Sequence, residues 1–534
     1  MKKTLIHLFV AILFLSCSKN KKDNEINKKN SLKVVWAKGI STLDPACADG
    51  FESAEVSSQI YESLVGIDSK TGQKKHILAT SHQNYADGLI WDFNIRKGVK
   101  FHDGTPMDAE SVVFAFQRQI DGLKAIKEGR ISSESCGYNY WKAYFTMIKS
   151  VKAVSKYKVR FKLNYNYAPF FKLLGFFTVG IVKPYKGQSD VLNKNPVGTG
   201  PFKFLSKQEG RVVLQRNENY WDKESIPNYK YLVFQTVADN RQRFLLLAGG
   251  NADIAHQLDP QRYRTLNLHP FLSIKKIKSV NVVYIALNTA KPPFSVLQNR
   301  LAANHTINRD KIVKLVYQGT AQIANLPIPP YLKIGNKPIY KTGKGGITWY
   351  DHNLSKAKAL FEEGGMYEDE MVKSLDLYHI RSPRSILPNP GLMANLIKSD
   401  FAKVGIKVNI HSLPYSEYKK ALAKGRHDMA IHAWIGDMRD PDNFLYGLLH
   451  SSTATNYAFF SNRRYNELVS KGRASVINKD RLKYYNDALQ IFIKQVPWVP
   501  LAHASLVFSY SKRIKNLQVR TSTTSIYNLM KKIK

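Results

Sequence analysis

Cysteine is scarce in this chain of 534 residues, which has three, at positions 17, 47 and 136. The sequence also lacks a C-x-x-C pair and any G-x-S-x-G, H-E-x-x-H or phosphate-loop motif. The pairs His102-Asp103 and His427-Asp428 resemble part of a hydrolase metal site, but such a site needs further His and Asp ligands around the ion. We therefore expect no enzyme, no catalytic residue, no metal site and no cofactor.

Acidic residues are also few, because 41 Asp and Glu stand against 80 Lys and Arg, a formal net charge of +39. A charge of this size attracts polyanions over long range. The basic residues are spread along the whole sequence, however, and no nucleic-acid-binding motif gathers them. We expect no nucleic-acid partner, while weak attraction to anionic lipid stays open.

The sequence has no apolar run of the roughly 20 residues that a membrane-spanning helix needs. The run from Leu5 to Leu15 follows two lysines and stops at Ser16-Cys17, a pattern typical of a secretory signal. Its end resembles the lipobox of bacterial lipoproteins, although Phe14 stands where Leu is usual. We predict a signal peptide over 1–16, cleavage before Cys17 and lipidation of Cys17. Secretory cleavage without lipid and an uncleaved anchor are the alternatives.

Residues 17–31 are rich in Lys and Asn and nearly free of apolar side chains, so they predict a flexible tether.

With Cys17 as the anchor, Cys47 and Cys136 are left, and in an oxidising envelope they could form a disulfide. Sequence separation does not show whether their Cα atoms approach closely enough, so this pairing stays open.

The rest of the chain alternates strand and helix signals. In 86–101 the residues Leu89, Trp91, Phe93 and Ile95 fall on one face of a half-buried strand, and Asp108 stands where a helix N-cap is expected. Further strands are predicted in 159–165, 282–289 and 403–413, and helices near 355–363, 391–404, 415–424 and 479–493. Mixed strands and helices of this kind indicate an α/β or α+β protein.

Several segments together resemble the family 5 bacterial extracellular solute-binding proteins, the dipeptide-, oligopeptide- and nickel-binding receptors of ABC importers. Their order and spacing carry the resemblance, which is closest to the dipeptide-binding type. The segments are STLDPA (41–46), QIYESLVGID (59–68), 87–118 with its RKGVKFHDGTP, NPVGTGPFKF (195–204), YIALNT (284–289), PPF (292–294), 302–321, 392–408 and AWIGDMRDPDNF, which begins at Ala433.

The resemblance implies a two-lobed periplasmic-binding-protein fold of class II, the large peptide-binding type with an extra inserted domain. Carried onto this chain, domain I comprises 32–55, 190–280 and 496–534. Domain II, residues 56–189, is inserted in the same lobe. Domain III, residues 281–495, forms the second lobe, and the lobes close over a ligand.

The resemblance also implies three ligand-binding residues. Asp437 matches the acidic residue that takes a peptide ammonium, Arg384 falls where the arginine for the terminal carboxylate lies, and Trp434 matches the aromatic beside the ligand. From the residues alone, a turn-capping role in a loop that also holds Asp440 and Asp442 is favoured for Asp437, and Trp434 could belong to the core. Arg381 is the alternative to Arg384.

We therefore expect a lipid-anchored protein on the periplasmic or extracytoplasmic side of the cell envelope. It would act as a monomer, capture short peptides, most simply dipeptides, and deliver them to the permease subunits of an ABC transporter. A receptor for haem, a nickel chelate or another small solute is the alternative on the same fold. A surface adhesin or antimicrobial-peptide trap is a third hypothesis.

Overall fold

The computed structural model describes residues 25–48, 50–68, 73–128, 145–186, 190–341, 347–368, 374–436, 438–519 and 524–533. Three of the predicted functional residues, Cys17, Cys136 and Asp437, lie outside the described residues, as does the predicted signal peptide 1–16. No helix within the described ranges is both long and apolar enough to cross a bilayer.

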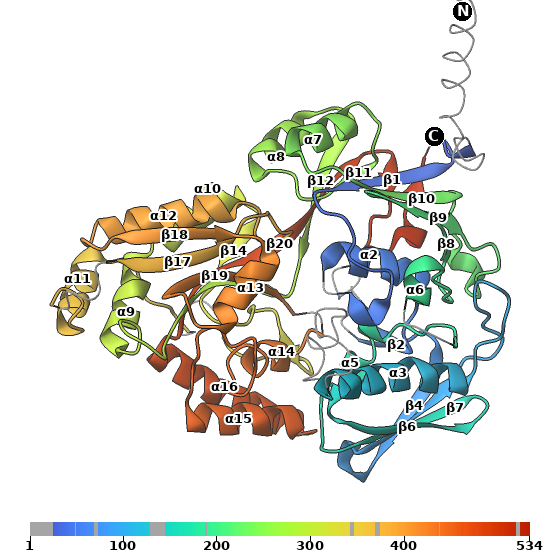
Figure 1. Cartoon of the computed structure of the whole chain (residues 1–534), viewed down its shortest axis with the longest axis horizontal. Coiled ribbons are helices and arrows are strands. Elements are labelled where there is room, and N and C mark those ends of the chain that lie inside the picture. Colours follow the sequence, from blue (N-terminus) through green and yellow to red (C-terminus); the bar gives the residue numbers. More distant parts are fainter. Residues whose placement is uncertain are drawn as a thin grey trace, which may run out of the picture.

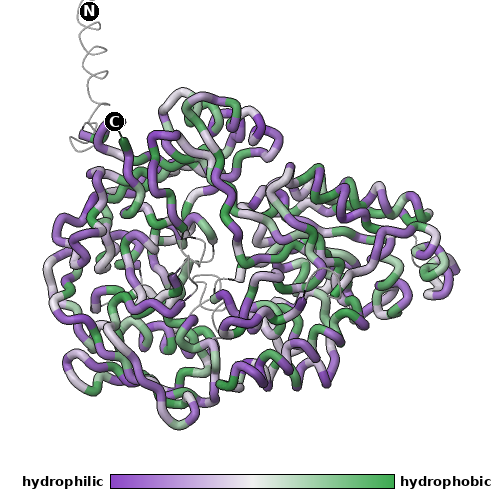
Figure 2. Tube along the Cα trace, turned by 180° about the vertical axis from the view of Figure 1, so that it is seen from behind, coloured by the Kyte–Doolittle hydropathy of each residue, from purple (hydrophilic) through white to green (hydrophobic). Residues whose placement is uncertain are grey.

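The molecule is an α/β protein with two lobes, which confirms the predicted fold class (Figure 1). We call residues 25–278 with the C-terminal end of the chain the first lobe, and residues 281–495 the second lobe. Figure 2 shows hydrophobic and hydrophilic segments alternating along the chain in both lobes, with hydrophilic segments frequent at the outer turns. Both lobes contribute to one continuous set of buried apolar side chains, so they pack against each other across their junction.

One sheet of 12 strands extends through both lobes in the order β18-β17-β19-β13-β20-β11-β1-β10-β9-β8, with β12 and β14 also paired to β20. Its strands are β1 (Ser31–Trp36), β8 (Phe202–Gln208), β9 (Arg211–Arg216), β10 (Tyr231–Thr236), β11 (Ile254–Ala255), β12 (Leu272–Lys278), β13 (Asn281–Leu287), β14 (Ala321–Ile323), β17 (Leu375–Ile380), β18 (Val408–Leu413), β19 (Met429–Ile435) and β20 (Trp498–Ser511).

Strand β20 joins the lobes, because its first half pairs with β13 of the second lobe and its second half with β12 of the first. The Asn281 side chain fixes the crossing point. Its amide donates to the carbonyl of Ala504 at 2.6 Å, and its side-chain oxygen accepts from the Ala504 backbone N–H at 2.9 Å. The His503 ring nitrogen Nδ1 lies 2.7 Å from the Asn281 carbonyl oxygen.

The first lobe contains a second, antiparallel sheet in the order β4-β5-β7-β6, formed by β4 (Ala79–Tyr85), β5 (Ile90–Ile95), β7 (Lys158–Leu163) and β6 (Ile148–Ser155). The predicted apolar face is confirmed, since Trp91, Phe93 and Ile95 of β5 are buried. Asp92 of the opposite face is also buried, where it pairs with Arg160 and Lys158 of β7. Asp108 is the N-cap of α3 (Ala109–Lys127) and accepts from the backbone N–H of Ser111 at 3.1 Å.

The helices of the first lobe are α2 (Phe51–Ile60), α3, α5 (Phe170–Leu173), α6 (Val191–Lys194), α7 (Asn240–Ala248) and α8 (Tyr263–Leu268). Those of the second lobe are α9 (Leu297–Thr306), α10 (Arg309–Tyr317), α11 (Leu354–Glu363), α12 (Pro390–Ala402), α13 (Tyr415–Ala423), α14 (Asp442–Leu445), α15 (Arg463–Ala474) and α16 (Asn478–Gln495). Three two-stranded pairs complete the fold: β2 (Val65–Ile67) with β3 (Lys74–His76), β15 (Lys333–Ile334) with β16 (Lys337–Pro338), and β21 (Ile514–Lys515) with β22 (Lys531–Lys532).

The Gly-rich segment 195–204 passes directly beneath the end of α2. A Cβ atom at Gly198 would lie 2.1 Å from the carbonyl oxygen of Ile60, and one at Gly200 would lie 2.4 Å from that of Gln59. Only glycine fits at either position, which gives this part of the sequence pattern a packing reason.

Cys47, at the end of a short 3-10 helix, is disulfide-bonded. Its partner lies outside the described residues, so the pairing of Cys47 with Cys136 stays a prediction.

Candidate functional site

The end of β19 carries the central part of the candidate site. Gly436 follows this strand, and its backbone N–H donates to the carbonyl of Val280 at 2.6 Å. A Cβ atom there would lie 2.2 Å from the ring of Phe444. The chain therefore turns after β19 at a place that admits only glycine, and this turn leads directly into position 437.

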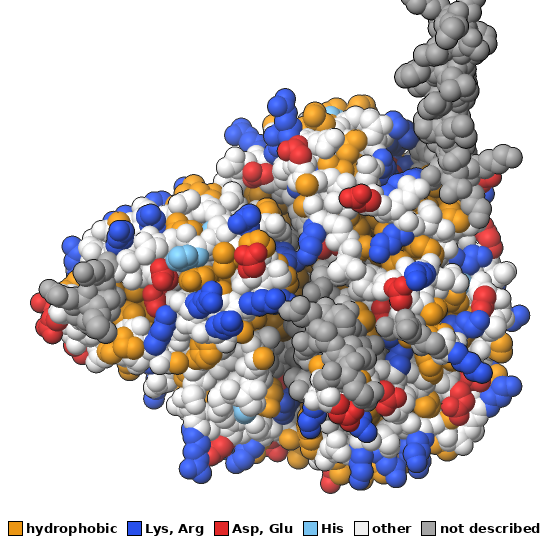
Figure 3. Space-filling view, viewed as in Figure 1, with side chains coloured by type: hydrophobic (Ala, Val, Ile, Leu, Met, Phe, Trp, Pro, Cys, Tyr) orange, Lys and Arg blue, Asp and Glu red, His pale blue; other side chains and the backbone are white. Residues whose placement is uncertain are grey.

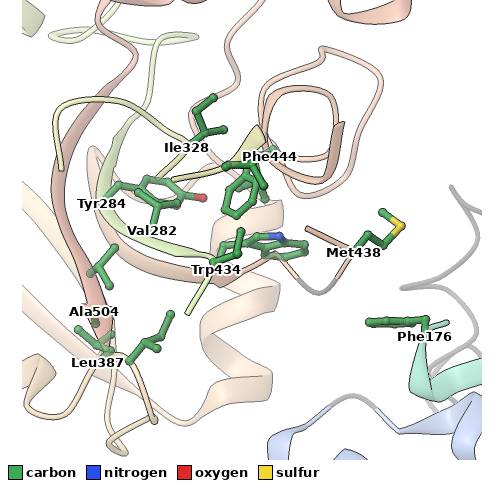
Figure 4. Packing of buried hydrophobic residues seen from close by; sticks show 14 of the residues in the cluster. Phe176, Val282, Tyr284, Ile328, Leu387, Trp434, Met438, Phe444 and Ala504 are labelled. Carbon is green, nitrogen blue, oxygen red and sulfur yellow. The ribbon is translucent and has the colours of Figure 1, made fainter. Parts of the chain in front are cut away.

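Trp434 lies on β19 at the junction of the lobes. Its side chain is 9% exposed, and its indole N–H donates to the side-chain oxygen of Asn443 at 3.0 Å. In Figure 4, Trp434 and Met438 of the second lobe lie on one side of the junction and Phe176 of the first lobe on the other. Trp434 thus packs within the second lobe and also faces the other lobe.

His432 lies two residues before Trp434, on the same face of β19. Its Nδ1 atom lies 3.2 Å from the Tyr418 hydroxyl, and its ring packs edge-to-face against Tyr284. Burial, together with the nearby positive charge of Arg384, lowers the pKa of His432 to about 3. The imidazole is therefore neutral at physiological pH, and the Arg384 guanidinium lies near enough to act on it.

Arg384 is half-buried, and its guanidinium lies 4.1 Å from the centre of the Tyr415 ring. Its backbone pairs with Leu387 in a short bridge. Arg384 lines a small cavity together with Gln257 and Phe508, which belong to the first lobe, so its side chain lies at the lobe junction. The alternative residue Arg381 is exposed and donates to the Ser412 carbonyl at 3.3 Å.

The loop after position 437 contains a fully buried carboxylate, Asp440, which contacts both lobes. Its oxygens lie 2.6 Å from Nη2 of Arg481 in its own lobe and 3.0 Å from Nζ of Lys172 in the first lobe. Burial alone would raise the pKa of Asp440, but the charges of Arg481 and Lys172 lower it well below the usual range. The carboxylate therefore stays ionised inside the protein.

Asp442 is a second buried carboxylate that has a partner in each lobe. Its carboxylate lies 3.1 Å from Nε of Arg473 in its own lobe and accepts from the Tyr167 hydroxyl of the first lobe at 2.9 Å. Burial raises the pKa of Asp442. The backbone N–H of Ala168 also donates to the Arg473 carbonyl at 2.9 Å. Together, the two carboxylates connect the loop beside position 437 to the first lobe, a role that the sequence does not reveal.

The two His-Asp pairs have packing roles. The His102 ring lies 3.0 Å from the Gly200 carbonyl oxygen, and the His427 ring lies 2.8 Å from that of Tyr457. Asp428 pairs with Lys291 at 2.9 Å. Within the described parts of the chain, no group of three or more His, Cys, Asp or Glu side chains is arranged to hold a metal ion.

These features define a protein of the two-lobed solute-binding class: two lobes, one strand that pairs in both of them, and aromatic and charged side chains at their junction. The model of the bacterial extracellular solute-binding proteins, family 5 (middle part), matches residues 75–456, and the chain belongs to this family. Its relatives are binding receptors, and the chain is not an enzyme.

Similar proteins cover nearly the whole chain. A haem-binding protein A of Haemophilus influenzae is 31% identical, covering 96% of each chain. A di/tripeptide-binding protein 2 of Pseudomonas aeruginosa is 29% identical, covering 92% of this chain and 95% of its own. The solved structure of the ABC transporter-associated periplasmic binding protein DppA of Helicobacter pylori, in complex with the peptide STSA, matches with a TM-score of 0.81 and 29% identity, over 94% of this chain and 98% of that chain.

Proposed function

We propose that this chain is the substrate-binding component of an ABC importer and that it captures short peptides, most simply dipeptides, between its lobes. The observation that carries the proposal is that the Arg384 guanidinium lies near His432 of β19, the strand that also holds Trp434 and ends just before position 437. Relatives named for di- and tripeptides, and a similar receptor with a bound peptide, support the same ligand class.

The two opposite charges of a zwitterionic peptide explain why an arginine near this strand matters. A closed receptor removes water from the ammonium and the carboxylate of the ligand, and unpaired burial of either charge is costly. In our proposal Asp437 takes the ammonium and Arg384 takes the carboxylate, because a planar guanidinium can bond both carboxylate oxygens. Trp434 packs beside the ligand.

The proposal also covers the location of the protein and its partners. The protein is a monomer anchored by lipid at Cys17 on the periplasmic or extracytoplasmic side of the envelope, with Cys47 and Cys136 paired. Loaded receptor delivers the peptide to permease subunits in the membrane. Basic side chains are spread over the face seen in Figure 3.

Calorimetric titration with Ala-Ala and with a tri- and a pentapeptide tests this function. Replacing Asp437 by Asn keeps the shape and removes the charge, so we expect the Kd for Ala-Ala to rise by about 30-fold or more, as expected for a lost buried charge pair. Asp310→Asn, which changes an exposed carboxylate at the start of α10, is the matched control and should leave the Kd unchanged.

Two results would contradict the proposal. The first is a wild-type protein that binds none of the peptides. The second is an Asp437→Asn variant that binds Ala-Ala as tightly as wild type does.

Haem is the second candidate ligand, favoured by the similarity to a haem-binding protein over almost the full length. The two ligands are separated by adding haem to the purified protein and recording the Soret absorbance, with and without excess Ala-Ala. A haem receptor shifts the Soret band at stoichiometric haem, whereas a dedicated peptide receptor does not.

A further inference from the structure

A large cavity lies between the lobes beside the loop that follows position 437, and we call it the Arg439 cavity. Its volume is about 910 Å3, within the size range of small-molecule sites. The first lobe contributes Lys74, Trp91 and Lys172 to its walls, and the second lobe contributes Tyr331 and Arg439. Both lobes thus form the cavity, as they would form a site that closes over a ligand.

Positive charge dominates this cavity. Among the residues that the structure describes, its lining contains one carboxylate, that of Asp440, and five cationic side chains: Lys74, Lys172, Lys333, Arg439 and Arg481. Two of these cations, Lys172 and Arg481, are engaged by Asp440. The Lys74 ammonium lies 4.8 Å from the centre of the Phe171 ring. The excess of positive charge favours an anionic occupant.

Arg439 is the cation best placed to bind such an anion. Among the residues that the structure describes, its half-buried guanidinium has no hydrogen-bond or ion-pair partner, although the Tyr331 side chain is near. Burial lowers the pKa of Arg439, which reflects the loss of water around its charge. An arginine carries five N–H donors, so an occupant with carboxylate oxygens would accept hydrogen bonds from donors that no described residue engages.

The backbone of Arg439 strengthens this inference. Its φ angle is +47°, in the left-handed region that favours glycine or asparagine. The Lys172 ammonium holds this backbone in place by donating to the Arg439 carbonyl at 3.0 Å. A bulky side chain kept in such a conformation is characteristic of functional positions, because another residue would fit with less strain.

We propose that the Arg439 cavity binds a carboxylate of the captured solute, so that this receptor prefers acidic ligands such as peptides with a Glu or Asp side chain. This inference rests on the proposed peptide function, because Arg439 follows the ammonium-binding position by two residues. The aromatic walls formed by Trp91 and Tyr331 suit an organic acid better than an inorganic anion.

The test compares Ala-Glu with Ala-Ala by calorimetry, using wild type, Arg439→Gln and the control Arg463→Gln. The control removes a charge whose side chain is 95% exposed. We expect wild type and control to bind Ala-Glu about tenfold more tightly than Ala-Ala, the gain expected from one charge-assisted hydrogen bond. Arg439→Gln should lose this preference, so that its Kd values for Ala-Glu and Ala-Ala become similar.

Equal affinity of wild type for the two peptides, or an undiminished preference in Arg439→Gln, would overturn the inference and leave peptide capture standing. If neither peptide binds, the proposed peptide function is wrong. The role of the cavity is then tested by measuring the Tm of the three proteins with and without citrate. Citrate should raise the Tm of wild type and of Arg463→Gln but not that of Arg439→Gln. An equal response of all three proteins rules out carboxylate binding by Arg439.

Discussion

The short loop 436–442 contains several residues with unusual surroundings. Gly436 is held against Phe444, Arg439 has a left-handed backbone conformation, and Asp440 and Asp442 are buried. Such a concentration of steric, conformational and electrostatic constraints is typical of a binding loop on a rigid support.

Replacing Arg439 by Gly separates the stability of this loop from its function. Glycine adopts a positive φ freely, and relief of the left-handed strain is worth roughly 1–2 kcal/mol, against about 0.5–1 kcal/mol for the added freedom of the unfolded chain. We expect the Tm of Arg439→Gly, measured by differential scanning calorimetry, to equal or exceed that of wild type while affinity for Ala-Glu falls. A lower Tm would mean that the arginine serves the packing of the loop instead.

The sequence predicts the identity of some site residues but not their partners. Trp434 could be named because it stands in a segment that resembles a family, and Arg384 because it falls where that family has an arginine. Both lie at the lobe junction. The contact of Asp440 with Lys172 joins positions 268 residues apart. That Arg439 has no ion-pair partner among the described residues likewise depends on the surrounding fold, which no local pattern in the sequence predicts.

Among the elements, the helix and strand predictions follow from short-range patterns and are confirmed to within a few residues, as α11, α13 and β5 show. Strand β20 is different. It pairs with β13 of one lobe and β12 of the other, so a boundary placed at its start assigns to one lobe a strand that pairs in both. Pairing over such distances depends on the topology of the whole sheet.

The contacts of Asp440 and Asp442 suggest how the lobes separate. Each carboxylate has one partner in the first lobe, Lys172 or Tyr167, and an arginine in its own lobe. When the lobes part, neither carboxylate loses all of its partners, so opening avoids the large cost of an isolated buried charge. The contacts can therefore form and break reversibly.

Replacing Lys172 by Met should weaken this closed arrangement. We expect faster release of Ala-Ala in stopped-flow measurements, by about five- to 100-fold, because one hydrogen-bonded ion pair across the junction is worth roughly 1–3 kcal/mol. Lys162→Met, which changes an exposed lysine of β7, is the control. An unchanged release rate in Lys172→Met would show that these contacts do not hold the lobes together.

For the whole molecule, buried histidines predict a dependence of stability on pH. Burial lowers the pKa of His256 and His432 to about 3 and that of His427 and His503 to about 4. Between pH 6.5 and about 4 the unfolded chain therefore binds more protons than the folded one, and stability falls as pH falls, by up to about 1.4 kcal/mol per pH unit for each histidine.

Urea unfolding between about pH 7 and pH 4.5 measures this loss. Repulsion within a chain of net charge +39 acts in the same direction, so the series is repeated in about 0.5 M salt, which screens exposed charges but not buried histidines. A loss of stability that disappears in salt would assign the effect to net charge instead.

The path of β20 also restricts when this protein can fold. The strand lies in the middle of the long sheet, yet it comes from residues 498–511, near the end of the chain. Until those residues have left the ribosome, β13 and β11 each lack a neighbour, and the two halves of the sheet have no shared strand. Contacts of such long range also make folding slow. The two lobes therefore cannot complete their shared sheet until residues 498–511 are available for pairing, and the edges of β13 and β11 stay exposed until then.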